Sequence, residues 1–143
     1  MNNFTEPYIR EADCEAIQGF RKTGYDFRFG DWHLIRGVIG EPCVATARDL
    51  IHMEDNREKY IWLPTGDQLD EEIAKICKKK ELWRYEFAIE NHFNWDCSVT
   101  FLRREKAPLG MGAVIDKTFT ASNSNPLIAK ICLLKQLIKE SEE

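Results

Sequence analysis

Hydrophobic and polar residues recur along this chain with two periods, and the clearer one begins at Thr65. Apolar residues then return every three or four positions, which places them on one side of a helix. They are Leu69, Ile73, Ile76 and Cys77. Thr65 and Gln68 have the spacing of a capping box, and acidic residues crowd the first turn while lysines follow the last. The pattern predicts an amphipathic helix over residues 65–79.

The second period is the strict alternation of a half-buried strand. From Trp83 every second residue is aromatic or aliphatic, and a second alternating run covers residues 93–101. Asn91 and His92 separate the two runs with the polar chemistry of a turn. Two alternating runs joined by a short polar break predict a β-hairpin. We expect it to be the start of a set of antiparallel strands over residues 82–120.

The N-terminal half gives weaker patterns. Residues 1–24 are expected to form a polar arm and a helix that ends at Gly24. Residues 25–63 are expected to contain strands, because apolar residues recur there in short runs bounded by turn residues. These strands are residues 25–29, 32–39 and 60–63. Residues 43–51 fit either a strand or one short helix, and the charged residues 52–59 predict a solvated loop.

The C-terminal part predicts one more strand and a final helix. Residues 103–112 are charged and then rich in proline and glycine, so we expect a flexible connection there. Residues 113–120 follow as a strand. Asn125 is suited to the N-cap of a helix, and Pro126 to the first helical position, where its missing N–H costs nothing. They predict a helix over residues 126–140.

These elements predict an α+β fold in which a mostly antiparallel sheet packs against two or three helices. The 143 residues suit a single domain, 1–143. A net charge of −4 argues against nucleic acid as a partner. Apolar runs are too short for a membrane span, and the N-terminus lacks the pattern of a secretory signal. Five cysteines without close pairs and three isolated histidines argue against a metal site, so we expect reduced thiols in the cytoplasm.

No catalytic motif is present in a recognisable frame, so we expect a protein that is not an enzyme and needs no cofactor. The candidate chemistry lies on the hairpin, where arginines alternate with aromatic rings. A ring can stack on a nucleotide base while a guanidinium grips phosphate. The candidate ligand-binding residues are Arg103, Arg104, Trp95, Asn91, His92, Asn94, Arg84 and Arg57. The alternative interpretation is a solvated sheet face with a tryptophan in the core.

Two parts of the chain resemble known phage proteins. The sequence from Tyr60 to Leu69 resembles a WLPT-x-DQL phrase found in small uncharacterised proteins of clostridial phages and prophages. The aromatic strand 95–101, the strand 113–120 and the step from Thr120 into the last helix resemble the phage ABA-sandwich domain. The resemblance covers about half of the chain, and its motifs concern architecture, so no ligand-contacting residue is carried over.

The resemblance implies an ABA-sandwich-like fold and a phage-encoded accessory protein that acts in the host cytoplasm without catalysis. Small phage proteins of this kind include sponges that sequester nucleotide immune signals, such as the cyclic ADP-ribose of Thoeris defence. They also include protein inhibitors of CRISPR effectors. We therefore expect an anti-defence protein that sequesters a small anionic cyclic nucleotide, with a pocket that a homodimer could complete. The alternative is a protein–protein inhibitor of a host defence effector, and an enzyme is the third hypothesis.

Overall fold

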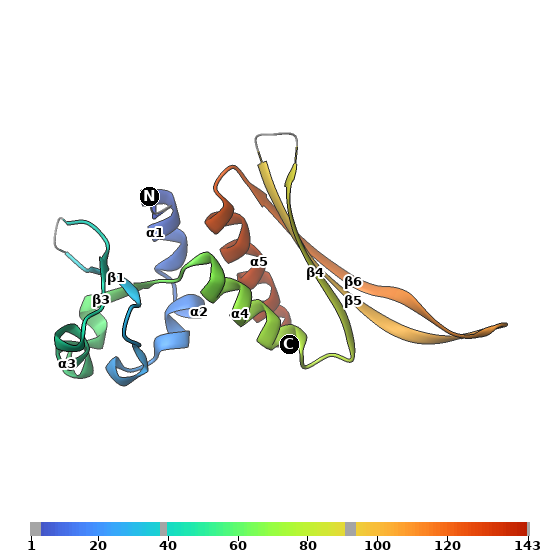
Figure 1. The fold of residues 1–143 in the computed structure, drawn as a ribbon, viewed down its shortest axis with the longest axis horizontal. Helices are drawn as coiled ribbons and strands as arrows, with labels where there is room; N and C mark the ends of the chain where they lie inside the picture. The colour runs from blue at the N-terminus through green and yellow to red at the C-terminus, as the bar shows by residue number, and fades with distance from the viewer. Residues whose placement is uncertain (1–3, 38–39, 91–93, 143) are drawn as a thin grey trace. The chain divides into compact units, whose positions relative to one another are not determined.

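The chain forms two compact units, Met1–Thr65 and Gly66–Glu143 (Figure 1). The computed structural model describes residues 4–37, 40–90 and 94–142. Each unit contains helices and a three-stranded sheet in which every described pairing is antiparallel. The predicted α+β class is confirmed, although the strands form two small sheets.

The N-terminal unit combines short helices with a sheet of strand order β2-β1-β3. Its α-helices are α1 (Glu6–Ala12), α2 (Glu15–Gln18) and α3 (Ala47–Asp55). Its 3-10 helices are η1 (Gly19–Arg21), η2 (Gly24–Asp26) and η3 (Arg57–Lys59). Its strands are β1 (Trp32–Ile35), β2 (Cys43–Val44) and β3 (Tyr60–Leu63). Tyr8, Ile17, Met53 and Leu63 are fully buried and form the core of this unit.

Three predictions for this unit are wrong. The helix expected to end at Gly24 is instead two short α-helices followed by η1, and Gly24 begins η2. In the other two, a local cap decides the outcome. The strand predicted over 25–29 is absent, because Asp26 accepts hydrogen bonds from the backbone and hydroxyl of Thr23 and closes the short helix η2. The charged loop predicted over 52–59 is mostly helical. Thr46 and Asp49 form a capping box that starts α3, which runs on through residue 55. The ambiguous stretch 43–51 is thus a two-residue strand followed by a helix.

The C-terminal unit follows the sequence patterns more closely. Its elements are α4 (Gly66–Cys77), β4 (Leu82–Glu90), β5 (Asn94–Ala107), β6 (Gly110–Asn123) and α5 (Pro126–Ser141). The predicted hairpin is confirmed by the antiparallel pairing of β4 with β5, and the strand order is β4-β5-β6. Asn125 caps α5 by accepting from the backbone of Leu127, with Pro126 at the first helical position as predicted.

The residues that form the core of this unit come from one face of the sheet and from both helices. α5 packs on β5 and β6, and α4 packs beside α5. Cys97 and Val99 on β5 are fully buried, as are Leu69 on α4 and Ile131 on α5. Serines and threonines occupy the other face of β5 and β6, so the sheet is apolar on one side and polar on the other.

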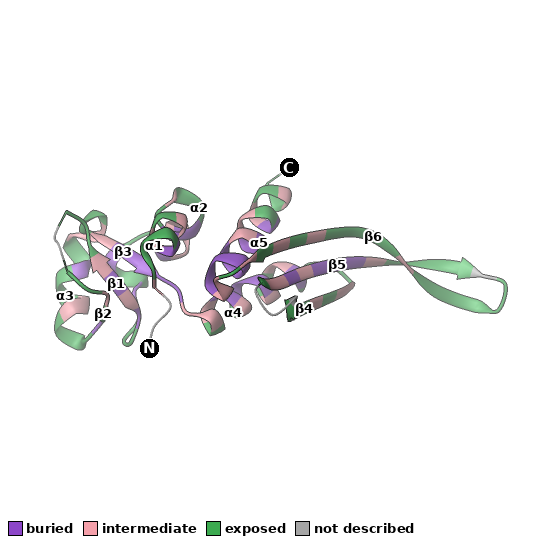
Figure 2. Cartoon of the chain, turned by 90° about the horizontal axis from the view of Figure 1, so that it is seen from above, coloured by how far each residue is buried: buried purple, intermediate pink, exposed green. Residues whose placement is uncertain are grey.

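The connection predicted over 103–112 is instead a paired ribbon. β5 and β6 are each 14 residues long, and they continue beyond the end of β4 as two strands (Figure 1). We call residues 103–114 the arm. Its pairing runs from Arg103 opposite Val114 to Ala107 opposite Gly110. Apart from the half-buried Val114, the residues whose burial is described are exposed (Figure 2). Charged and glycine residues form strands here because the partner strand supplies the backbone hydrogen bonds.

Candidate functional site

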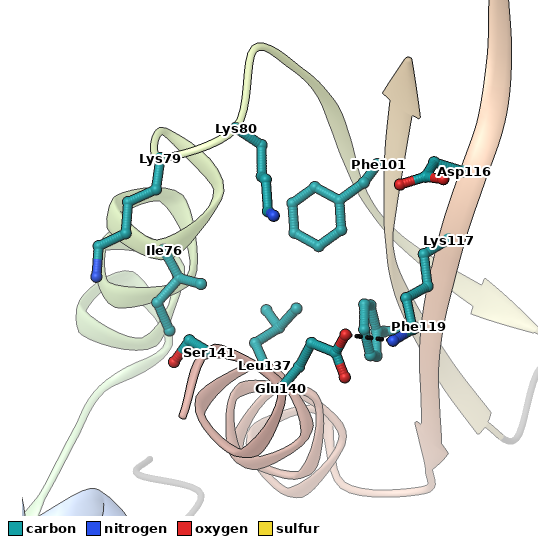
Figure 3. Close-up of a pocket in the computed structure, with 10 residues that line it drawn as sticks. All are labelled: Ile76, Lys79, Lys80, Phe101, Asp116, Lys117, Phe119, Leu137, Glu140 and Ser141. Carbon is teal, nitrogen blue, oxygen red and sulfur yellow. Dashed lines mark hydrogen bonds and ion pairs between the residues drawn. The ribbon is translucent and has the colours of Figure 1, made fainter. Parts of the chain in front are cut away.

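A cavity of about 380 Å³ opens in the C-terminal unit, between the sheet and the last turns of both helices (Figure 3). Its apolar lining consists of Ile76, Phe101, Phe119 and Leu137. Its polar lining consists of Lys79, Lys80, Asp116, Lys117, Glu140 and Ser141. The volume lies within the range of about 300–1,000 Å³ that small-molecule sites usually have. The cavity is large enough for a small ligand with both an apolar and a charged part.

Local backbone features bring these residues together. The pairing of β5 with β6 shifts between Phe101 and Leu102, so Asp116 is an extra residue on β6. Beyond this irregularity Lys117 stands opposite Phe101, on the face of the sheet that the helices cover. α4 ends at Cys77, and the chain just after it supplies the two lysines at positions 79 and 80.

Two phenylalanine rings form an aromatic wall of the cavity. Phe101 and Phe119 meet edge to face, with ring centroids 5.9 Å apart and planes at 78°. The Lys117 ammonium lies 5.5 Å from the centre of the Phe119 ring. Phe101 is buried and Leu137 is almost fully buried, so the floor of the cavity is apolar. A flat, poorly hydrated group would gain contact here that a purely ionic ligand would not.

Some of the lysines around the cavity are available to bind an anionic ligand. Lys117 pairs with Glu140, which neutralises both (Figure 3). Lys79 and Lys80 form no ion pair with any residue that the structure describes. The lining holds three lysines and two carboxylates, so it carries one net positive charge. In Figure 3 the Lys80 side chain points toward the Phe101 ring. The cavity therefore combines an aromatic wall with ammonium groups that a ligand anion could engage.

A second hollow, of about 410 Å³, lies in the N-terminal unit around Lys22, Thr23 and residues 54–59. Arg57 is among its lining residues, but no aromatic residue is. Its charged residues are balanced, with three cations and three carboxylates. Without an aromatic wall or a charge excess, it offers less to an anionic nucleotide than the cavity at Phe101.

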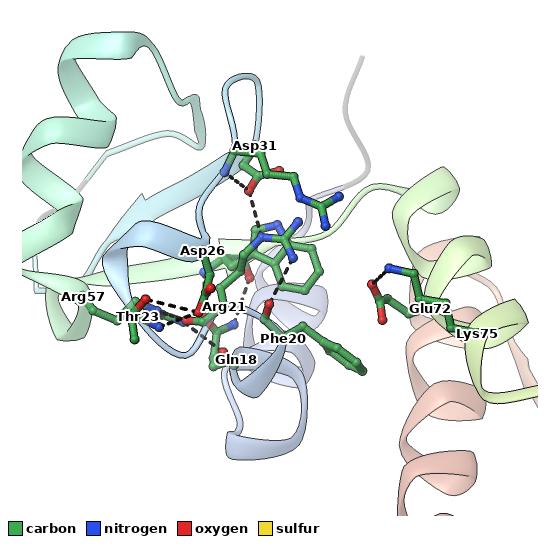
Figure 4. Close-up of polar contacts among 11 residues, drawn as sticks. Gln18, Phe20, Arg21, Thr23, Asp26, Asp31, Arg57, Glu72 and Lys75 are labelled. Carbon is green, nitrogen blue, oxygen red and sulfur yellow. Dashed lines mark hydrogen bonds and ion pairs between the residues drawn. The ribbon is translucent and has the colours of Figure 1, made fainter. Parts of the chain in front are cut away.

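Arg57, a predicted ligand residue, cross-links the N-terminal unit (Figure 4). Its guanidinium donates to the carbonyl oxygens of Arg21, Tyr60 and Gln18, and also to Oε1 of Gln18. It lies 4.8 Å from the centre of the Phe27 ring. Burial lowers the pKa of Arg57 from its ordinary value. All three of its nitrogens donate within the fold, which favours a structural role for Arg57.

The predicted residues on the hairpin are spread over both faces of the sheet. Trp95 is on the helix-covered face and stacks on Phe87, with centroids 5.0 Å apart. Arg84 and Arg104 are on the opposite face, where they pair with the carboxylates of Glu86 and Glu81. Arg104 is also about 30 Å along the strand from Trp95, at about 3.3 Å per residue.

The other predicted residues are either exposed or outside the described residues. Asn94 is exposed at the start of β5, and Arg103 is exposed at the base of the arm. Asn91 and His92 lie outside the described residues. The described members of the candidate ligand-binding set are not gathered into one site, and the cavity is lined by other residues.

Sequence reasoning assigned the acidic start of α4 to the helix dipole alone, and it missed a half-buried network there. The Asp70 carboxylate accepts from the Tyr85 hydroxyl at 2.6 Å and from the Lys130 ammonium at 3.0 Å. Lys130 also lies 4.3 Å from the centre of the Phe87 ring. Burial, and then Asp70, raise the pKa of Tyr85. A lysine on the apolar stripe of the last helix was the available signal, because a buried ammonium requires a partner.

No group of three histidine, cysteine, aspartate or glutamate side chains within the described ranges is arranged to hold a metal ion. None of the described helices is both long and apolar enough to cross a membrane. No known family model matches this chain, and no curated protein or solved structure shows significant similarity to it.

Proposed function

We propose that this protein binds and sequesters a small anionic nucleotide, without catalysis, in the cavity between Phe101 and Phe119. The observation that supports this is the combination of an apolar, aromatic floor with lysines at the rim. A nucleotide has a flat base and a phosphate, and the two parts match these two surfaces. The predicted class of ligand is thus retained, with a different set of residues from the one expected on the hairpin.

The contacts of the lining residues suggest which part of a nucleotide each would bind. Phe119 is half-buried and presents its ring to the cavity, so it is the candidate for contact with the base. Lys79 and Lys80 are exposed and have no ion-pair partner among the described residues, so they are the candidates for phosphate. Lys117 is held by Glu140 and would contribute by keeping that carboxylate neutralised.

Binding without turnover is the simpler role for such a site. The Ser141 hydroxyl donates to the carbonyl of Ile138, and Lys117 is paired with Glu140. The polar lining contains no histidine or cysteine. A general base within reach of a nucleophile is what hydrolysis or group transfer would need. Retention of an unchanged ligand is therefore what we expect.

The resemblance to phage proteins sets the choice of ligands to test. Isothermal titration calorimetry with cyclic ADP-ribose isomers, ADP-ribose and cyclic dinucleotides covers the expected immune signals. Adenosine and pyrophosphate serve as half-ligands, because each offers only the base or only the charge. We expect at least one complete nucleotide to bind and both half-ligands to bind much more weakly.

Matched variants connect any binding to the cavity. Lys80→Ala and Phe119→Leu should each weaken binding by about tenfold, which is about 1.4 kcal/mol. Lys78→Ala is the control, because this neighbouring lysine is exposed and does not line the cavity. Mass spectrometry of the ligand recovered after denaturation should find it intact. Absence of binding by every nucleotide, equal loss in the control, or recovery of a converted product would each refute the proposal.

A further inference from the structure

We propose that the outer edge of β6 pairs with the same edge of a second copy of this chain, about a two-fold axis at Ala113. The proposal concerns the arm and does not depend on what the cavity binds. β6 is the last strand in the order β4-β5-β6, so it has β5 on one side only. Near α5 the carbonyl of Thr120 accepts from Gln136. Within the arm, the backbone N–H and C=O groups that point away from β5 are a template for another strand.

The edge of β6 lacks the usual protection within the arm. Native edge strands are blunted by charged residues, proline or bulges. From Gly110 to Ile115 the strand carries no charge and no proline, and the irregularity in its pairing comes after it, at Asp116. The cations of the arm lie on the other strand, at Arg103, Arg104 and Lys106. The uncharged edge is therefore confined to one short segment, which favours pairing at a defined place.

Three apolar residues of this segment share one face of the ribbon. Met111, Ala113 and Ile115 oppose Lys106, Arg104 and Leu102 on β5, so they alternate on a single side. Met111 is 64% exposed and Ile115 is 65% exposed. On the body of the same sheet, this face carries threonine and serine. The change to large apolar residues occurs only where the ribbon leaves the body of the unit.

A two-fold axis at Ala113 makes the edge self-complementary. In an antiparallel pair about this axis, Met111 opposes Ile115 of the copy, and Gly112 opposes Val114. Apolar residues then meet on one face, and no charge opposes another within the segment. An axis at Lys117 would oppose two ammonium groups, and an axis at Ile115 would oppose Val114 with Asp116. Of these three axes, the one at Ala113 pairs Met111 with Ile115, and it avoids both the repulsion at Lys117 and the contact of Asp116 with Val114.

Pairing would also stabilise the arm. A two-stranded ribbon is only marginally stable in water, whereas four strands with a shared apolar face are far more stable. The two-fold axis closes the assembly at two copies, because each chain uses its single β6 edge. The contact is short, so we expect a dissociation constant on the order of 10–100 μM, typical of a small interface.

Sedimentation velocity between about 1 and 500 μM tests the dimer, over a range that brackets the expected constant. Wild-type protein should shift from monomer to dimer as concentration rises. Ile115→Lys should remove the dimer, because it places two ammonium groups near the axis. Thr118→Lys is the matched control, since it adds the same charge to an exposed residue of β6 outside the segment. Circular dichroism should show that both variants remain folded.

A disulfide trap tests the register itself. Opposed residues at the axis have Cα atoms about 4.5–5.5 Å apart, within the range that a disulfide spans. In a Cys43→Ser background, Ala113→Cys should form a covalent dimer on mild oxidation, with the bond located by peptide mass spectrometry at position 113. Thr118→Cys should not, because its two copies would lie roughly 34 Å apart.

The outcomes separate cleanly. A concentration-dependent dimer lost in Ile115→Lys and trapped at position 113 supports the proposal. A monomer at every concentration overturns it, as does open-ended aggregation. Equal dimerisation of Ile115→Lys and wild type, or trapping in Thr118→Cys but not in Ala113→Cys, overturns the register and with it the proposed edge.

Discussion

Replacement of Arg57 distinguishes a structural residue from a ligand residue. Its guanidinium makes four hydrogen bonds, three of them to backbone carbonyl groups, and lies over Phe27. Each such bond is worth about 0.5–1.5 kcal/mol net. Because the side chain is only half-buried, water can replace part of this hydrogen bonding, so we use the lower half of the range obtained for four bonds. Arg57→Ala should therefore cost about 2–4 kcal/mol of unfolding free energy.

That loss is large compared with the expected stability of the unit that contains Arg57. A compact unit such as Met1–Thr65 is expected to have about 3–10 kcal/mol of stability, from the usual value per residue. Arg57→Lys keeps the charge but not the planar fork of donors, so it should recover only part of the loss. Lys59→Ala, at an exposed position of the same short helix, should cost less than about 0.5 kcal/mol.

Urea unfolding and hydrogen exchange together provide the measurement. Urea midpoints report the size of the loss, and hydrogen exchange by mass spectrometry should place the lost protection in peptides from residues 4–65. A structural role for Arg57 would be ruled out if Arg57→Ala kept the wild-type midpoint and exchange pattern while abolishing nucleotide binding. Arg57 would then be a ligand residue, as its place in the sequence had suggested.

Three further predictions concern buried polar groups. Burial lowers the pKa of His33 from its ordinary 6.5. The contribution of the neutral imidazole to the free energy of unfolding is therefore complete above about pH 6.5 and declines as pH falls below it. His33→Phe should make the urea midpoint less dependent on pH between about pH 7.5 and 5.5. Asp70→Asn should cost about 1–3 kcal/mol in urea unfolding, because it leaves the buried Lys130 ammonium without a charged partner, and adding Lys130→Met should recover part of that loss; an additive double variant would contradict the pairing. Burial raises the pKa of the Cys97 thiol to about 12, so Ellman's reagent should modify the exposed Cys43 at once and Cys97 only after unfolding.

The elements that sequence patterns predicted well are those whose signals are local and agree with one another. In α5, Asn125, Pro126 and a broad apolar stripe all favour the same helix. The alternation from Trp83 onward predicts the hairpin, because one face of the sheet is buried and the other is polar. Where two local signals competed, the alternation at residues 25–29 lost to the cap between Thr23 and Asp26.

The arm shows why composition alone can mislead. Residues 103–112 contain charges, proline and glycine, which are typical of a loop. They form strands because β5 and β6 have matching lengths beyond β4, and each supplies the other's hydrogen bonds. That condition depends on two segments at once and is not visible in either one.

Local sequence patterns were enough to predict the α+β class, the amphipathic helices and the hairpin. Which residues meet depends on how these elements pack. Phe101, Phe119, Lys80 and Leu137 lie on four separate parts of the chain, and the packing of both helices on the sheet brings them to one cavity. Trp95 and Arg104 lie nine positions apart on β5, so strand alternation alone places them on opposite faces. Periodicity specifies the face on which a residue lies within its own element, but not which residue of another element it meets.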